Sequence, residues 1–545
     1  MRLLSMSSSH ACRRLAQAGW ILVAAVLIGG CGNNYRPVVT PVPTNGPAAQ
    51  PASYVVAVSS PSPTADGIAS IIDYSGDSMV AQAPIGVGPL AFTIDEAGST
   101  GYTYNSDQTI TNFPLLTNLQ QKLELVTTLP ATAQPVNLAA PAGALWIGDL
   151  TGNQVDLFGG SPEQFKLSLP MAPNSIPSFI AGVPTSSGQR EYVIDQNVAA
   201  SNPTGVECNL TPTIEPNGVA TPVEISNDTI DTPIPLDPLA ATTGSQLARC
   251  PVYAVQSPDQ RRLFVLNRGS DTISVINSQN NTPDECTPFT NQNGQPVTCH
   301  PILPLSLNAV TALQTADANP NAPPGIPTSP PNGTAGMTAT SGPIYAEYVA
   351  ATSTLVVANY DAGTVSIIDV TLDQYGNDSP TFGTTYTVKV GNNPASVTAL
   401  YDGSRAYTAD QTDGTVTIVN LSSHSVEKTL QVIGHPRTVV STQNSLYGKV
   451  YAGSPDSPYL TILETEHDLE DATILLEGNV VDVRTTSQNG GKQSVVTYNG
   501  SASVGTFNFS SRIPGFGQPC NLPPGMMVAK YGASYTLADC RAMPQ

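Results

Sequence analysis

Charged residues are scarce in this chain, where they make up 11% of the 545 residues. Their balance is acidic, with 21 Lys and Arg against 41 Asp and Glu, and the formal net charge is −20. A surface of this sign repels phosphate, so the composition argues against a nucleic-acid partner. It also disfavours docking of the globular part on an anionic membrane surface.

Several signatures of specific chemistry are missing as well. The sequence has no C-x-x-C pair and no C-x-x-C-H haem attachment motif. It contains no nucleophile elbow, phosphate-binding loop or zinc-protease helix motif. His300, His424 and His467 share no spacing typical of metal ligands. The sequence therefore names no catalytic residue, no metal site and no cofactor.

Long amphipathic helical patterns are also lacking. The chain instead holds 45 Gly and 49 Pro, both above average usage, between short runs rich in Val, Ile, Thr and Tyr. Residues of these types suit pleated, half-buried strands. The composition predicts an all-β protein made of many short strands.

The N-terminal segment is typical of an export signal. Its apolar run, 20–28, follows a basic region and is too short for a spanning helix. The run ends at Ile28-Gly29-Gly30-Cys31, which resembles a bacterial lipobox. The resemblance implies that residues 1–30 are a lipoprotein signal peptide and that Cys31 carries the lipid anchor. The alternatives are a plain secretory signal and twin-arginine export directed by the Arg pair at 13–14.

Residues 31–53 contain five prolines and no apolar periodicity, so we expect an extended tether. A multiply acylated Cys31 would bind a membrane stably. The expected location is therefore the cell envelope, with a lipid anchor in the outer membrane and the domain on its periplasmic or surface face.

Apart from Cys12 in the signal segment and Cys31, six cysteines remain, and they fit an exported chain because an even count in an oxidising compartment favours disulfides. Sequence cannot fix their connectivity. Pairing between neighbours in sequence is the hypothesis that we favour, and it joins Cys208 to Cys250, Cys286 to Cys299, and Cys520 to Cys540.

One phrase, a short apolar strand, a polar turn and a second strand, recurs along the chain. Its clearest copy is 356–369, VVANYDAGTVSIID. The polar residue that ends each first strand falls at Asn105, Asp149, Asp195, Asn267, Asn359, Asp410, Ser454 and Asn499. The common interval is about 44 residues, and strand-based repeats of about 40–50 residues indicate propeller blades.

The phrases VVANYDAGTVSIID, YTADQTDGTVTIVN and FVLNRGSDTISVIN resemble the YVTN-type β-propeller repeat of the lactonase-like and quinoprotein-like group. This resemblance is strongest over 250–470. It implies four-stranded antiparallel blades over 54–510, with insertions at about 201–250 and 278–343 and a C-terminal tail at 511–545.

Eight blades are favoured, with seven as the alternative. Eight first strands can be counted from Tyr102 to Asn499, although the one at Asp195 lacks a clear second strand. An additional hairpin, 54–59 with 68–73, precedes them. We expect strand 79–85 to close the ring by completing the last blade, because an open stack would leave exposed edges.

The candidate ligand-binding residues are His435 and Arg437, in the loop that leads into an innermost strand near the channel mouth. The Asn and Asp series is expected to be structural, because short polar side chains that end a strand satisfy backbone groups in turns. The function favoured is a membrane-tethered binding or scaffold module for an envelope protein or a small ligand. The alternative is a lactonase-like or quinoprotein-like enzyme with its site at the central channel.

The lipobox makes a direct prediction. Replacing Cys31 by Ser removes the acyl acceptor, so radiolabelled palmitate incorporation should be lost while the Cys12→Ser control keeps the label. Labelling that persists in Cys31→Ser would show that the lipobox interpretation is wrong.

Overall fold

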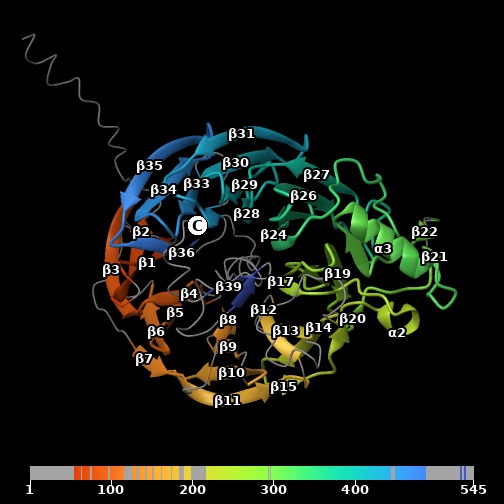
Figure 1. Cartoon of the computed structure of the whole chain (residues 1–545), viewed down its shortest axis with the longest axis horizontal. Coiled ribbons are helices and arrows are strands. Elements are labelled where there is room, and N and C mark those ends of the chain that lie inside the picture. Colours follow the sequence, from red (N-terminus) through yellow and green to blue (C-terminus); the bar gives the residue numbers. More distant parts are fainter. Residues whose placement is uncertain are drawn as a thin grey trace, which may run out of the picture. The chain divides into compact units, whose positions relative to one another are not determined.

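The computed structural model describes residues 54–485, apart from gaps of which the longest are 116–124, 183–189, 198–215 and 443–447, together with the backbone of 528–530 and 533–535. The signal peptide, the tether, the hairpin expected at 496–507, and Cys31, Cys208, Cys520 and Cys540 lie outside these residues. Residues 50–545 belong to one compact unit, in which eight antiparallel blades form a β-propeller (Figure 1).

The first four blades are built mainly from the N-terminal half. From the inside outwards, blade 1 contains β36 (Asn479–Thr485), β1 (Tyr54–Ser60), β2 (Asp66–Asp73) and β3 (Ser78–Val87); blade 2 contains β4 (Pro89–Ile94), β5 (Thr100–Asn105), β6 (Thr109–Pro114) and β7 (Leu125–Thr128); blade 3 contains β8 (Pro135–Ala139), β9 (Leu145–Asp149), β10 (Gln154–Gly159) and β11 (Gln164–Pro170); blade 4 contains β12 (Ser175–Ala181), β13 (Arg190–Asn197), β14 (Val219–Glu224), β15 (Thr229–Ile230) and β16 (Ile234–Pro235).

The other four blades follow in the same order. Blade 5 contains β17 (Pro251–Gln256), β18 (Arg262–Asn267), β19 (Thr272–Asn277), β20 (Thr282–Pro283) and β23 (Ile302–Pro304); blade 6 contains β24 (Pro343–Val349), β25 (Thr354–Asn359), β26 (Thr364–Asp369) and β27 (Thr385–Lys389); blade 7 contains β28 (Pro394–Ala399), β29 (Arg405–Asp410), β30 (Thr415–Asn420) and β31 (Ser425–Gln431); blade 8 contains β32 (Thr438–Ser441), β33 (Lys449–Gly453), β34 (Tyr459–Glu464) and β35 (Leu469–Leu475).

Strands in the middle of a blade are buried on both faces because each blade packs between two neighbours. In β18 every residue is buried, and in β25 all but the first are. Such strands need continuous apolar runs, which is why the repeated phrase carries so few polar residues. The outer strands β31 and β35 contain only exposed and half-covered positions, and each carries two charged residues.

Ring closure differs in one respect from the expectation. The eight blades are confirmed, and β3 is the outer strand of the closing blade as expected. However, the N-terminal hairpin β1–β2 is itself the middle pair of that blade, and β36 supplies only its innermost strand. Blade 1 therefore joins three strands from the start of the described chain to one from near its end, and it needs no hairpin at 496–507.

The doubtful repeat at Asp195 is a complete blade. Its third strand is β14, which pairs with β13 in register, with Asp195 opposite Val219. The sequence pattern hid this strand because 21 residues separate Asn197 from Val219. Part of the segment expected to be an insertion, 219–235, thus supplies the third and outer strands of blade 4.

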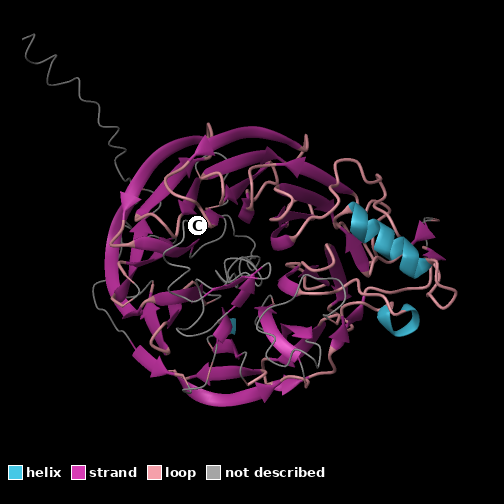
Figure 2. Cartoon of the chain, in the orientation of Figure 1, coloured by secondary structure: helices cyan, strands magenta, loops and turns pink. Residues whose placement is uncertain are grey.

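A second insertion, after β20, lies on the outside of the ring beside blade 5 (Figure 2). It contains the hairpin β21 (Phe289–Thr290) and β22 (Pro296–Val297) and the helix α3 (Leu307–Asp317), whose N-cap Ser306 accepts a hydrogen bond from the Ala309 amide at 3.1 Å. The short helix α2 (Ala240–Thr243) precedes β17, and the strands β38 (Val528–Lys530) and β39 (Ala533–Tyr535) pair with each other.

The insertion carries the disulfide between Cys286 and Cys299, one of the three pairs expected from neighbouring positions. Cys250 is also disulfide-bonded, to a cysteine outside the described residues. Its expected pairing with Cys208 remains a prediction, as does that of Cys520 with Cys540.

A buried ionic cluster attaches the insertion to two blades. The Nη2 of Arg262 on β18 lies 3.1 Å from Asp284 Oδ1 and 3.1 Å from Asp378 Oδ1. The Asp378 carboxylate also lies 2.7 Å from Nδ1 of His300. Burial, and next the charge of Asp378, raise the pKa of Asp284. Replacing one member by a neutral residue would leave the charges of its partners buried and unpaired, which strongly destabilises a folded protein.

The polar residues of the repeated phrase end the second strands of the blades and have a structural role, as predicted, but their main partners are side-chain hydroxyls and not the backbone groups that were expected. The amides of Asn267 and Asn359 each donate to two hydroxyls on the next strand, at 2.8–3.1 Å. Asn105 makes the same pair of contacts. In blade 7 the position is Asp410, which accepts hydrogen bonds from Thr408, Thr415 and Thr417.

Asp410 gives a test of this arrangement. Burial raises its pKa from 3.8 to about 6, so its stabilising, protonated form is retained below pH 4 and lost as the pH rises through 6. Replacing Asp410 by Asn, the residue used in three other blades, should raise the free energy of unfolding at pH 7 by up to about 3 kcal/mol and leave it little changed at pH 4.

Urea denaturation of Asp410→Asn between pH 4 and pH 8 measures this effect. The control is Asp317→Asn, at an exposed position at the end of α3. A gain that does not depend on pH would contradict the assignment to the buried carboxyl group.

Candidate functional site

The two predicted ligand residues lie in different environments. His435 is half-exposed, and its Nδ1 lies 2.5 Å from Oδ2 of Asp456, in the turn between β33 and β34. Arg437 is buried, and its Nη2 donates to the carbonyl of Val481 on β36 at 3.3 Å. The structure therefore separates the two side chains, and binding of a ligand by either residue remains a prediction.

Innermost strands from opposite sides of the ring carry buried ionisable groups near its centre (Figure 1). Arg484 donates from Nη2 to Asp482 Oδ2 at 3.1 Å, and its guanidinium lies 6.0 Å from the ring centre of Phe92. Facing strands contribute Tyr253 and Tyr345, with ring centres 4.7 Å apart. Burial raises the pKa of both tyrosines, and the charges of Glu347 and Arg484 also act on them.

These channel groups are almost fully covered. Asp482 is 0% exposed, Arg484 2% and Glu347 3%. With Arg437, they comprise two positive and two negative charges, so the cluster is balanced. Buried, paired charges of this kind hold strands in place, and they do not by themselves form a ligand site.

Away from the channel, tyrosines connect neighbouring blades at three seams. In each case the tyrosine is the third residue of the second strand of its blade. Its hydroxyl donates a hydrogen bond to the turn that precedes the outer strand of the next blade. Tyr102 donates to Glu163 at 3.2 Å and Tyr407 to Asp468 at 2.5 Å. Tyr192 donates to Asn281 at 2.8 Å and to the Ser278 carbonyl at 3.2 Å.

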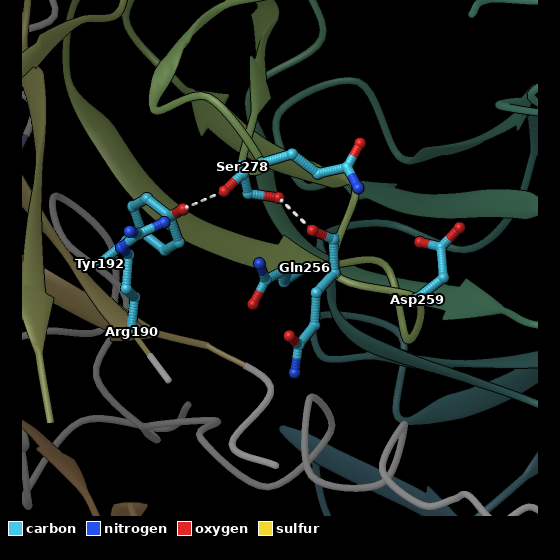
Figure 3. Close-up of a pocket in the computed structure, with 7 residues that line it drawn as sticks. Arg190, Tyr192, Gln256, Asp259 and Ser278 are labelled. Carbon is cyan, nitrogen blue, oxygen red and sulfur yellow. Dashed lines mark hydrogen bonds between the residues drawn. The ribbon is translucent and has the colours of Figure 1, made fainter. Parts of the chain in front are cut away.

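A pocket of about 310 Å³ opens at the seam between blades 4 and 5 (Figure 3). Its residues come from the start of β13, from the end of β17 and the turn that follows it, and from the turn after β19; they are Arg190, Tyr192, Gln256, Asp259, Gln260, Ser278 and Gln279. All carry polar side chains. In Figure 3, Arg190 and Asp259 lie on opposite sides with Gln256 between them.

The walls of the pocket are firmly held. Tyr192 is 1% exposed, and burial raises its pKa to about 12, so its hydroxyl remains a protonated donor at neutral pH. The Ser278 hydroxyl donates to the Gln260 carbonyl at 2.9 Å, which joins the two turns. The Arg190 Nε pairs with Glu224 and lies 3.8 Å from Asp231 Oδ2, both in its own blade.

Sequence reasoning missed this pocket, because its residues come from two repeats and lie up to 89 positions apart. A signal was present nonetheless. The turn between the third and the outer strand has Asp468 as its fourth residue in blade 8 and Asn281 in blade 5. Both residues have a φ of 55°, so they occupy the same place in the turn. A blade-by-blade alignment of these turns would have marked the seam as irregular.

Among the described residues, Glu464, Glu466 and His467 form the one group whose ligand atoms lie within 4.8 Å of each other. Two of these residues are exposed, and exposed acidic groups gather in this way without an ion, so we assign no metal to them. Within the same part of the chain, no helix is long and apolar enough to cross a membrane.

Neither protein-family models nor curated protein sequences gave a match to this chain. Among solved structures, it is similar to dihydro-heme d1 dehydrogenase NirN, with a TM-score of 0.52 and 13% identity over 81% of this chain and 77% of that one. It also resembles AztD from Citrobacter koseri, with a TM-score of 0.46 and 11% identity over 79% and 97% of the two chains. At such identities the likeness concerns the fold alone.

The fold and the comparisons together define the class. The chain is a β-propeller protein, and within that class it is an eight-bladed propeller closed by β36 and β1.

The seam contacts predict unequal costs for one substitution. Tyr407→Phe removes a hydrogen bond to a carboxylate and should lower the free energy of unfolding by about 1.5–3 kcal/mol. Tyr192→Phe removes bonds to neutral acceptors and should cost about 0.5–1.5 kcal/mol. Urea denaturation of both variants at pH 7 measures the difference, and equal costs would contradict the distinction between the two seams.

Proposed function

We propose that this chain is a lipid-anchored binding module of the cell envelope whose ligand site is the pocket between blades 4 and 5. The observation that carries the proposal is the pocket itself, a cavity of about 310 Å³ at this seam that is lined only by residues with polar side chains. A small polar ligand suits it, because each wall offers hydrogen-bonding groups and the pocket holds no large apolar surface.

The chemistry of the lining favours binding over proton transfer. Tyr192 stays protonated at neutral pH, and the remaining groups are amides, a hydroxyl, a guanidinium and one carboxylate. The location at the envelope rests on the lipobox at Cys31 and on the proline-rich tether. The YVTN-type resemblance of the repeats agrees with an exported propeller but names no ligand.

A lactonase-like or quinoprotein-like enzyme with its site at the central channel is the second candidate. It is favoured by the ionisable groups that the innermost strands contribute to the channel wall, above all Glu347, Arg484 and Tyr345. Its weakness is that all three groups are covered and that Arg484 is already paired with Asp482.

The two candidates separate in one set of measurements on the full-length protein in detergent. Small polar compounds that raise the melting temperature should lose their effect in Gln279→Trp, where a bulky exposed side chain fills the pocket. The matched control is Glu466→Trp, at the same exposed turn position in blade 8, and it should respond as the unmodified protein does.

Lactone hydrolysis is assayed on the same preparations. Hydrolysis that is lost in Glu347→Gln or His435→Ala but unaffected by Gln279→Trp would favour the enzyme. Compounds that stabilise Gln279→Trp as strongly as the unmodified protein would exclude the pocket as the binding site.

A further inference from the structure

A basic residue opens the second strand in four blades. These residues are Arg190, Arg262, Arg405 and Lys449, and in three of the four seams an acid from the next blade pairs with them. Arg262 pairs with Asp378, Arg405 with Asp468, and Lys449 with Asp77. The chain thus places a carboxylate from the following blade against the cation at this position.

The seam between blades 4 and 5 breaks this rule. The turn residue that corresponds to Asp468 is Asn281, whose neutral amide cannot neutralise Arg190. Arg190 forms ion pairs through Nε with two acids of its own blade, Glu224 and Asp231. The Arg190 side chain also interacts with Tyr192, which lines the same pocket. A ligand carboxylate bound on the pocket side of Arg190 would take the place of the acid from the next blade that the other three seams contain.

The opposite side of the pocket carries a negative charge. Asp259 lies in the turn between β17 and β18, where its Oδ1 accepts a hydrogen bond from Ser257 at 2.6 Å. Its side chain is 52% exposed and lies 3.6 Å from Nε of Arg261, a surface pair of low energy. The pocket and its immediate surroundings contain three acids, namely Glu224, Asp231 and Asp259, and two arginines, Arg190 and Arg261. This excess of negative charge also tolerates an added cation.

We propose that the pocket binds a zwitterion, namely a free amino acid or a short peptide. Its carboxylate lies against the guanidinium of Arg190, where charge-assisted bonds to a planar donor set are strong. Its ammonium group lies toward Asp259. The backbone amide of a peptide then lies along the wall that contains Gln256 and Gln279. This inference rests on the proposed binding function of the pocket and specifies the class of ligand.

Isothermal titration of the full-length protein in detergent at pH 7 tests it with four probes: Ala-Ala, N-acetyl-Ala-Ala, Ala-Ala amide, and the neutral compound that carries both blocking groups. Ala-Ala should bind best, and each blocking group should weaken binding by about five- to tenfold. The doubly blocked compound should bind most weakly.

Variants assign each charge to its partner. Asp259→Asn should remove the preference for a free amine and keep the preference for a free carboxylate. Arg190→Gln should do the reverse, and the conservative Arg190→Lys should retain part of the carboxylate preference. Asp402→Asn, in the equivalent turn of blade 7, is the matched control and should change none of the four affinities.

The outcomes distinguish this inference from the proposed binding function on which it rests. Equal affinity for all four probes, or binding of neutral sugars alone in a manner that Gln279→Trp abolishes, would refute the zwitterion and leave a binding pocket. If Gln279→Trp weakens the binding of no compound, both the zwitterion and the pocket as a ligand site are refuted. Charge preferences that survive in Asp259→Asn and Arg190→Gln would also overturn the assignment.

Discussion

The pairing of β1 with β36 is the constraint on which the rest of the structure depends. Six pairs of residues join a strand from the start of the described chain to one from near its end, and only this pairing turns a row of blades into a ring. A closed ring has no exposed sheet edge at its junction, which removes a site for association with other chains. The joint also places Asp482 and Arg484 on the innermost strand, where their charges meet those of Arg437 and Glu347 across the wall.

The seams between blades use a small set of contacts that vary in detail. At the seam between blades 7 and 8, Tyr407 and Arg405 converge on the single carboxylate of Asp468. Between blades 4 and 5 the same two positions are Tyr192 and Arg190, but the acid is replaced by Asn281. A pocket with charged and amide walls lies at this seam. Repeated positions in this protein build the ring, and the pocket lies where one of these positions departs from the repeat.

Much of the architecture could be predicted from the chain. The spacing of the polar residues that end the second strands revealed propeller blades, and the hydrogen bonds of Asn267 and Asn359 explain why such residues recur. The third strand of blade 4 was hidden because 21 residues lie between Asn197 and Val219. The closing blade was assigned partly to the wrong hairpin, since a repeat pattern alone does not say which strands cross the junction. His435 and Arg437 were grouped because they are close in sequence, but both precede β32, and the structure places His435 against Asp456 and buries Arg437 against Val481 of β36.

The sequence by itself determined the strand repeats and the polar turns, because each depends on residues that are close together along the chain. Tertiary structure alone decided the partners of the buried charges and the position of the pocket. Arg190 and Asp259 are 69 positions apart and belong to different blades, so nothing local relates them. Their common pocket exists because blades 4 and 5 pack side by side and because Asn281 does not supply the carboxylate that three other seams possess.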